Sequence, residues 1–186
     1  MQNSNENSFI RFKSIPKYII IFLTILGCAI TINQVFNIGL FNFRPVSNSY
    51  LYLLIGLFQP IVFLIFPISK KYENTITSID ILAAISIFFI GVYFSINAEN
   101  ILTSGWDIEA PLFPTILSIL LIILSLESLR RTGGYFIFSI ALFFSIYPIF
   151  ADKMPGALWG NTYSFIEAAR AHSMGLDSLI GIPMKV

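Results

Sequence analysis

The sequence predicts an all-α fold: a polytopic membrane helix bundle with about five transmembrane helices and a C-terminal amphipathic segment. Of its 186 residues, 56% are hydrophobic and only 11% are charged, so most of the surface must face lipid. The apolar residues form long runs without period-2 alternation, and such runs satisfy their backbone hydrogen bonds in lipid only as helices. The basic residues of successive loops also fall on alternate sides. The five runs are 17–36, 50–68, 79–97, 112–129 and 135–150.

Residues 1–16 are expected to form a cytoplasmic tail that leads into the first span. The run 17–36 is longer than the apolar core of a signal peptide, and no small-residue cleavage pattern follows it. Four more apolar runs follow. We therefore expect the first run to be retained as a transmembrane helix.

The second run carries Gln59 and Pro60 near its middle. Proline lacks an N–H and leaves the carbonyl of Gly56 without its helical partner, so a kink or local unwinding is expected. Two interpretations are open. A broken helix marks an ion or substrate site in some transporters, whereas a simple kink would leave Gln59 to bond a neighbouring helix.

Charged residues stand only near the ends of the later runs. Asp80 begins the third run and Glu127 ends the fourth, so both carboxylates are expected at the membrane interface. Glu127 precedes Arg130 and Arg131 by three and four positions, a spacing that predicts an ion pair on one helix face. The segment 132–134, which ends in Gly134, is too short for a domain and predicts an antiparallel helical hairpin.

The distribution of lysine and arginine predicts a cytoplasmic N-terminus and five crossings. One set of loops carries most of the bases, and the intervening loops carry few. The first set is Arg11, Lys13, Lys17, Lys70, Lys71, Arg130 and Arg131; the second is Arg44 and Lys153. Residues 151–186 are then extracytoplasmic. In this tail, helical spacing over Tyr163–Met174 places Phe165, Ile166 and Ala169 on one face of an amphipathic helix.

The sequence lacks the residue patterns that several classes of function require. The single histidine, His172, has no second histidine or cysteine at metal-ligand spacing, and no GxSxG motif is present, so His172 is interpreted as an ordinary surface residue. We therefore expect no enzyme activity, no cofactor and no metal site. A net charge of +1 with bases in pairs gives no footprint for nucleic acid. The expected environment is the lipid bilayer.

Three stretches resemble the fused permeases of tripartite ATP-independent periplasmic (TRAP) transporters. Glu127-Ser-Leu-Arg-Arg-Thr-Gly-Gly-Tyr135 resembles their E-A-x-R-R-x-x-G-[WY] element, Met154-Pro-Gly156 their L-P-G, and Leu179-Ile-Gly-Ile-Pro183 their G-I-F-G-I-P. Lys185 stands where the family usually has Gly. The residues that match are Glu127, Arg130, Arg131, Gly134, Pro155, Gly156, Gly181 and Pro183.

The resemblance implies the small-domain portion of a sodium-coupled uptake system in the bacterial inner membrane. In that family the small domain is a scaffold, and the large permease domain, which holds the solute and sodium sites, begins near the G-I-P stretch. That large domain is therefore expected to be absent from this chain. An extracytoplasmic substrate-binding protein, here expected to be of the TAXI type, would deliver a carboxylate or an amino acid. The alternative is a self-contained small membrane protein, either an assembly or interaction factor or an oligomeric channel.

Overall fold

The computed structural model describes residues 16–39, 45, 47–73 and 75–175, and in this part the chain forms helices and turns. Within these described residues four helices are long and apolar enough to cross a membrane, so the chain is a helical membrane protein. They are Lys17–Val35, Asn48–Ile65, Ser78–Ile96 and Leu112–Ile149. The chain divides into two compact units, up to Asn97 and from Ala98.

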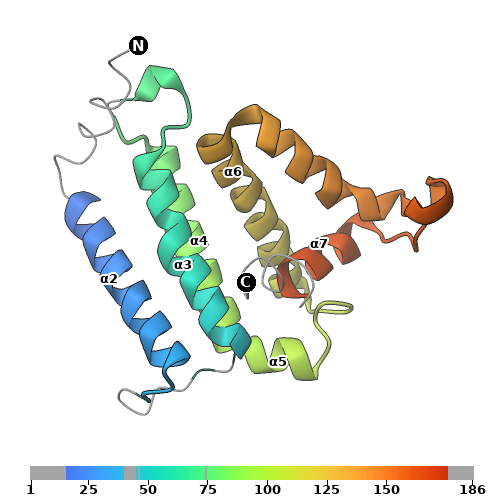
Figure 1. Cartoon of the computed structure of the whole chain (residues 1–186), viewed down its shortest axis with the longest axis horizontal. Helices are drawn as coiled ribbons and strands as arrows, with labels where there is room; N and C mark the ends of the chain where they lie inside the picture. The colour runs from blue at the N-terminus through green and yellow to red at the C-terminus, as the bar shows by residue number, and fades with distance from the viewer. Residues whose placement is uncertain (1–15, 40–44, 46, 74, 176–186) are drawn as a thin grey trace. The chain divides into compact units, whose positions relative to one another are not determined.

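The described part of the first unit holds three long helices. They are α2 (Pro16–Val35), α3 (Ser47–Ile65) and α4 (Ser78–Ile96), and α3 packs along both of the others (Figure 1). A short 3₁₀ turn, η3 (Lys70–Tyr72), lies between α3 and α4. The largest fully buried side chains of this unit are Tyr52, Phe63, Phe94, Leu51 and Ile87.

Two glycines let α3 and α4 approach closely. A Cβ atom at Gly91 would lie 2.5 Å from the Cα atom of Gly56 and 2.8 Å from the carbonyl oxygen of Tyr52, so no larger residue fits there. Near the same contact the hydroxyl of Ser49 bonds the carbonyl oxygen of Ser95 at 2.9 Å. Small residues and interhelical hydrogen bonds of this kind hold membrane helices together.

The structure decides between the two outcomes expected at Pro60. Residues on both sides of Pro60 remain helical, so α3 is not unwound at Gln59 and Pro60, and the kink stays a prediction. Pro60 is buried where α3 packs between its neighbours, and this packing holds the helix through the proline. Asp80 lies in the first turn of α4 and is fully buried within the chain, and its place at the membrane interface stays a prediction. Its carboxylate accepts from the backbone N–H of Thr77 at 3.0 Å in a capping box, and a carboxylate is stabilised at a helix N-terminus.

The second unit is built on α6 (Leu112–Ile146), which follows the short α5 (Ala98–Thr103). Gly134 interrupts α6 with φ 74° and ψ −176°, so the element consists of two limbs that meet at an elbow. The limbs correspond to the predicted fourth and fifth spans. Figure 1 draws them diverging from the elbow with α7 (Phe165–Met174) between them, so they do not pair as the simple antiparallel hairpin that was predicted. The reason is that α7 packs against α6 in the space between the limbs.

The chain reaches α7 through three 3₁₀ turns, η4 (Tyr147–Ile149), η5 (Ala151–Lys153) and η6 (Gly156–Leu158). Two backbone bonds tie the stretch between η6 and α7 back to η4 and η5: Tyr163 donates to the carbonyl of Pro148 at 3.0 Å and Gly160 to that of Ala151 at 3.1 Å.

The predicted amphipathic helix is present as α7. On the face that was predicted to be apolar, Ala169 is buried within the chain, whereas Phe165 is 58% and Ile166 46% exposed. Mostly small side chains pack against α6, because they allow the two backbones to come close. The buried residues of α7 are Ala168, Ala169, Ser173 and Met174.

Candidate functional site

The elbow of α6 gathers the charged residues of the predicted ion pair. Arg130 donates two hydrogen bonds to the carboxylate of Glu127, from Nε to Oε2 and from Nη2 to Oε1, and each is 2.7 Å long. Arg131 adds a bond from its Nε to Oε1 at 2.8 Å. The predicted ion pair is therefore confirmed, and it is a cluster of one carboxylate with two guanidinium groups. Bidentate, charge-assisted bonds of this type fix side-chain geometry as well as adding stability.

The cluster reaches across the elbow to the second limb. The guanidinium carbon of Arg130 lies 5.6 Å from the ring centroid of Tyr135, a cation–π contact between the two limbs. Gly134 stands between them in a backbone region that is open only to glycine. Each residue of the Arg-Arg-x-x-Gly-Tyr order thus has a place in the structure. The two arginines bind Glu127 at the end of the first limb, Gly134 adopts the conformation of the turn, and the Tyr135 ring contacts Arg130.

The second motif lies at the other end of the second limb. Pro155 is extended, and Gly156 has φ 59°, again a conformation that favours glycine. Here the hydroxyl of Tyr147 donates to the carbonyl of Leu158, which ties η4 to η6. The structure therefore does not bring Pro155 and Gly156 to the elbow. Gly181 and Pro183 lie outside the described residues.

His172, for which the sequence indicated no role beyond the surface, joins α7 to the second limb. Its Nε2 lies 3.0 Å from the carbonyl oxygen of Ser145. With Asp107 and Glu167 it lines a cavity of about 710 Å³ within the second unit. Only the fold brings these residues together, because they come from a loop and from α7; their spacing in the sequence gives no sign of it.

The carboxylate of Glu167 takes part in the capping box at the N-terminus of α7. It accepts from the backbone N–H of Ser164 at 2.7 Å, and the hydroxyl of Ser164 accepts from the backbone N–H of Glu167 at 3.3 Å. These bonds, above all the one from the backbone of Ser164, lower the pKa of Glu167 below its ordinary value. The Glu167 carboxylate therefore caps α7 in its ionised form.

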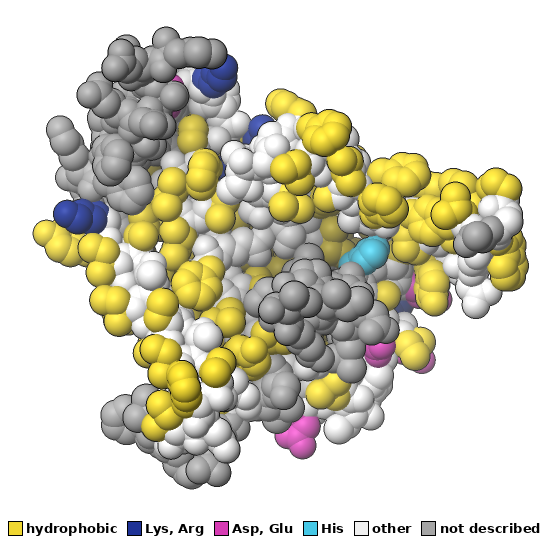
Figure 2. Space-filling model, viewed as in Figure 1, with side chains coloured by type: hydrophobic (Ala, Val, Ile, Leu, Met, Phe, Trp, Pro, Cys, Tyr) yellow, Lys and Arg dark blue, Asp and Glu magenta, His cyan; other side chains and the backbone are white. Residues whose placement is uncertain are grey.

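Most of the remaining surface is suited to lipid. Figure 2 shows apolar side chains gathered over α2 and over the second limb of α6, and among them Ile25, Phe136 and Phe144 are more than 60% exposed. Gln59 is half-buried within α3. Among the described residues no group of histidine, cysteine and carboxylate side chains is placed to hold a metal ion.

The elbow is thus the best-defined polar site of the described chain, and its geometry is that of a rigid joint between two helical limbs. Comparison with known proteins adds no relative: no family model, no curated protein and no solved structure matches this chain.

Proposed function

We propose that this chain is the small membrane domain of a TRAP-type secondary transporter. The observation that carries the proposal is the elbow. The residues that resemble the family element form one connected unit, in which Glu127, Arg130, Gly134 and Tyr135 each have a distinct structural task. The positive φ of Gly156 in the second motif adds support.

In this role the chain is a scaffold of the bacterial inner membrane and not an enzyme. Its partners are a large permease domain, which binds solute and sodium, and an extracytoplasmic substrate-binding protein. An elevator-like movement of a large domain needs a fixed neighbour in the membrane, and a bundle with glycine-tight packing at Gly56 and Gly91 suits that task.

The test is uptake by whole cells. The DNA beside this gene is searched for an open frame that encodes about ten or more apolar helices and for a binding-protein gene. Cells that express all three proteins are expected to accumulate labelled carboxylates or amino acids when a sodium gradient is present. Cells that lack only this chain should not. Equal uptake with and without it, or unrelated neighbouring genes, would contradict the proposal.

A second candidate is an assembly or interaction factor that works without a large domain. One observation favours it: α7 buries Ala168, Ala169 and Met174 within its own unit and therefore already has a partner in α6. Co-purification separates the two candidates. A large multi-spanning protein that stays bound through detergent exchange supports the transporter scaffold, whereas exchange with several client proteins supports the factor.

A further inference from the structure

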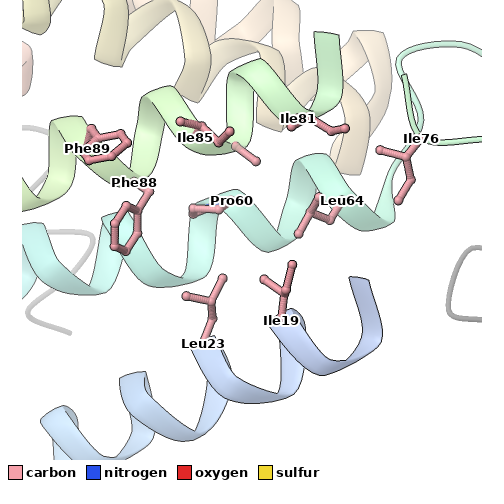
Figure 3. Close-up of a pocket in the computed structure, with 10 residues that line it drawn as sticks. Ile19, Leu23, Pro60, Leu64, Ile76, Ile81, Ile85, Phe88 and Phe89 are labelled. Atoms are coloured by element: carbon pink, nitrogen blue, oxygen red, sulfur yellow. The ribbon is translucent and has the colours of Figure 1, made fainter. Parts of the chain in front are cut away.

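An apolar groove runs through the first unit, between α2 and α4, with α3 as its floor (Figure 3). Its volume is about 440 Å³. Ile76 lies at one end of the groove, in the loop before α4. The other lining residues are Ile19 and Leu23 of α2, Pro60 and Leu64 of α3, and Ile81, Ala84, Ile85, Phe88 and Phe89 of α4.

The lining offers no polar side chain, and Pro60 has no backbone N–H to donate. Water therefore gains little by entering, because a buried water needs several polar partners. The three helices that form the groove are all long and apolar enough to cross a membrane, so the surrounding medium is acyl chains. A lipid acyl chain in the groove would make the dispersion contacts that the lining residues lack when the groove is empty. The volume falls within the range of about 300–1,000 Å³ that holds small ligands.

Ile76, at one end of the groove, is close to a positively charged turn, because the backbone N–H of the preceding Thr75 donates to the carbonyl of Tyr72 in η3 at 3.2 Å. Lys70 and Lys71 of η3 are both exposed. The turn is held by backbone bonds, among them the one from Tyr72 to the carbonyl of Ser69 at 2.9 Å. Two carboxylates lie near this end in the sequence, Glu73, which is half-buried, and Asp80, which is fully buried in its capping box. The most exposed charges of this turn are therefore the two ammonium groups, which attract an anionic headgroup.

We propose that this groove is a binding site for an anionic phospholipid, with one acyl chain between α2 and α4 and the phosphate group at Lys70 and Lys71. The site depends on the membrane environment of the three helices and not on the transporter assignment. It would fix α2 against the other two helices, because only 17% of the membrane-spanning stretch of α2 is buried within the chain.

The first arm of the test fills the groove. The full chain is purified in detergent and titrated with phosphatidylglycerol or phosphatidylcholine, and bound lipid is counted by native mass spectrometry. Ile85→Trp places a large ring into the groove, and Leu82→Trp is its matched control, because Leu82 is 69% exposed on the same helix and outside the lining. One tightly held phosphatidylglycerol per chain is expected in the parent and in Leu82→Trp, with at least a fivefold loss in Ile85→Trp. If Ile85→Trp fails to fold, Ile81→Trp takes its place.

The second arm removes the charges. The double variant Lys70→Gln, Lys71→Gln is expected to lose the preference for phosphatidylglycerol over phosphatidylcholine, while Lys153→Gln in the second unit keeps it. Because each lysine near an anionic headgroup contributes modestly, a loss of about fivefold or more is the expected size. Equal binding of both lipids by the parent, or unchanged binding in Ile85→Trp and Ile81→Trp, would overturn the proposal.

Discussion

At the scale of single residues, the elbow depends on one carboxylate that serves two arginines. Glu127→Gln removes the charge but keeps the size, and both guanidinium groups then lose their ionic acceptor at Glu127. The side chain of Arg131 is only 1% exposed, so water cannot fully replace the carboxylate. We expect a loss of about 1–3 kcal/mol in stability, measured as a lower thermal unfolding midpoint in detergent. Glu99→Gln, at an exposed position of α5, is the control and should leave the midpoint unchanged.

Gly134 gives a second prediction at this scale. A Cβ at this position would meet no atom within 4 Å, so any cost comes from the backbone conformation alone. Gly134→Ala is expected to destabilise the elbow by about 1–3 kcal/mol, because φ 74° with ψ −176° is essentially restricted to glycine. Gly133→Ala is the comparison for crowding without backbone strain, because Gly133 has no positive φ and its Cβ would lie 2.8 Å from Cδ1 and 3.0 Å from Cβ of Ile137. An unchanged unfolding midpoint in Gly134→Ala would show that the elbow is not under this constraint.

The scale of the elements shows what the sequence could and could not predict. The helices α2 and α4 begin and end within one residue of the predicted runs, and α3 within three, because lipid leaves a long apolar run no alternative to a helix. The Glu127 cluster was predictable for a similar reason, since helical spacing alone brings its members together. Local rules were sufficient in each of these cases.

The sequence does not predict features that depend on a partner distant along the chain. The buried face of α7 is set by its fit against α6, which selects Ala168 and Ser173 over the larger Phe165. Pro60 remains in a continuous helix because neighbours pack on both sides of α3. His172 meets Ser145 across 27 positions of sequence. Periodicity contains no information on any of these contacts.

The α3–α4 pair yields a prediction about elements. Gly91→Ala would push a Cβ into the backbone of α3, at 2.5 Å from the Cα atom of Gly56, and backbone cannot move aside as a flexible side chain can. Overpacking of this kind costs about 1–3 kcal/mol. The variant should lose folded protein in size-exclusion chromatography. Gly56→Ala, whose nearest contacts are 3.2 Å, should lose less. The reverse order would contradict this close crossing of the two helices.

The cap of α7 predicts a dependence on pH. The pKa of Glu167 is lowered in the folded chain, so its contribution is present above its ordinary pKa of 4.5 and is lost as pH falls through the lowered value. The protection of residues 165–174 against hydrogen exchange, taken relative to the intrinsic exchange rate at each pH, should therefore fall in acid. Glu167→Gln should remove this part of the pH dependence, while Glu109→Gln, at an exposed loop position, should retain it. Identical profiles in all three proteins would exclude the cap as the cause.

At the scale of the whole molecule, the number of crossings depends on the second limb of α6. Residues 135–146 span about 18 Å as helix, and η4 adds about 6 Å, which is less than the roughly 30 Å of a bilayer core. Aromatic residues follow the limb, with Trp159 62% and Tyr163 46% exposed, and such residues favour the membrane interface. The limb therefore has arginine residues at the elbow and aromatic residues at its far end, and both kinds of residue favour a membrane–water interface.

We therefore predict five crossings with the N-terminus in the cytoplasm, the second limb being accommodated by local thinning of the bilayer. Single cysteines at the exposed positions Ser104, Thr132 and Asn161, in a Cys28→Ser background, report the side of each segment to a membrane-impermeant thiol reagent. Ser104 and Asn161 should react from outside intact cells, and Thr132 only after permeabilisation. Reaction of Ser104 but not Asn161 from outside would show that the second limb returns to the cytoplasmic face, which would reduce the count to four. Reaction of Thr132 alone would invert the whole topology and place the Glu127 cluster outside.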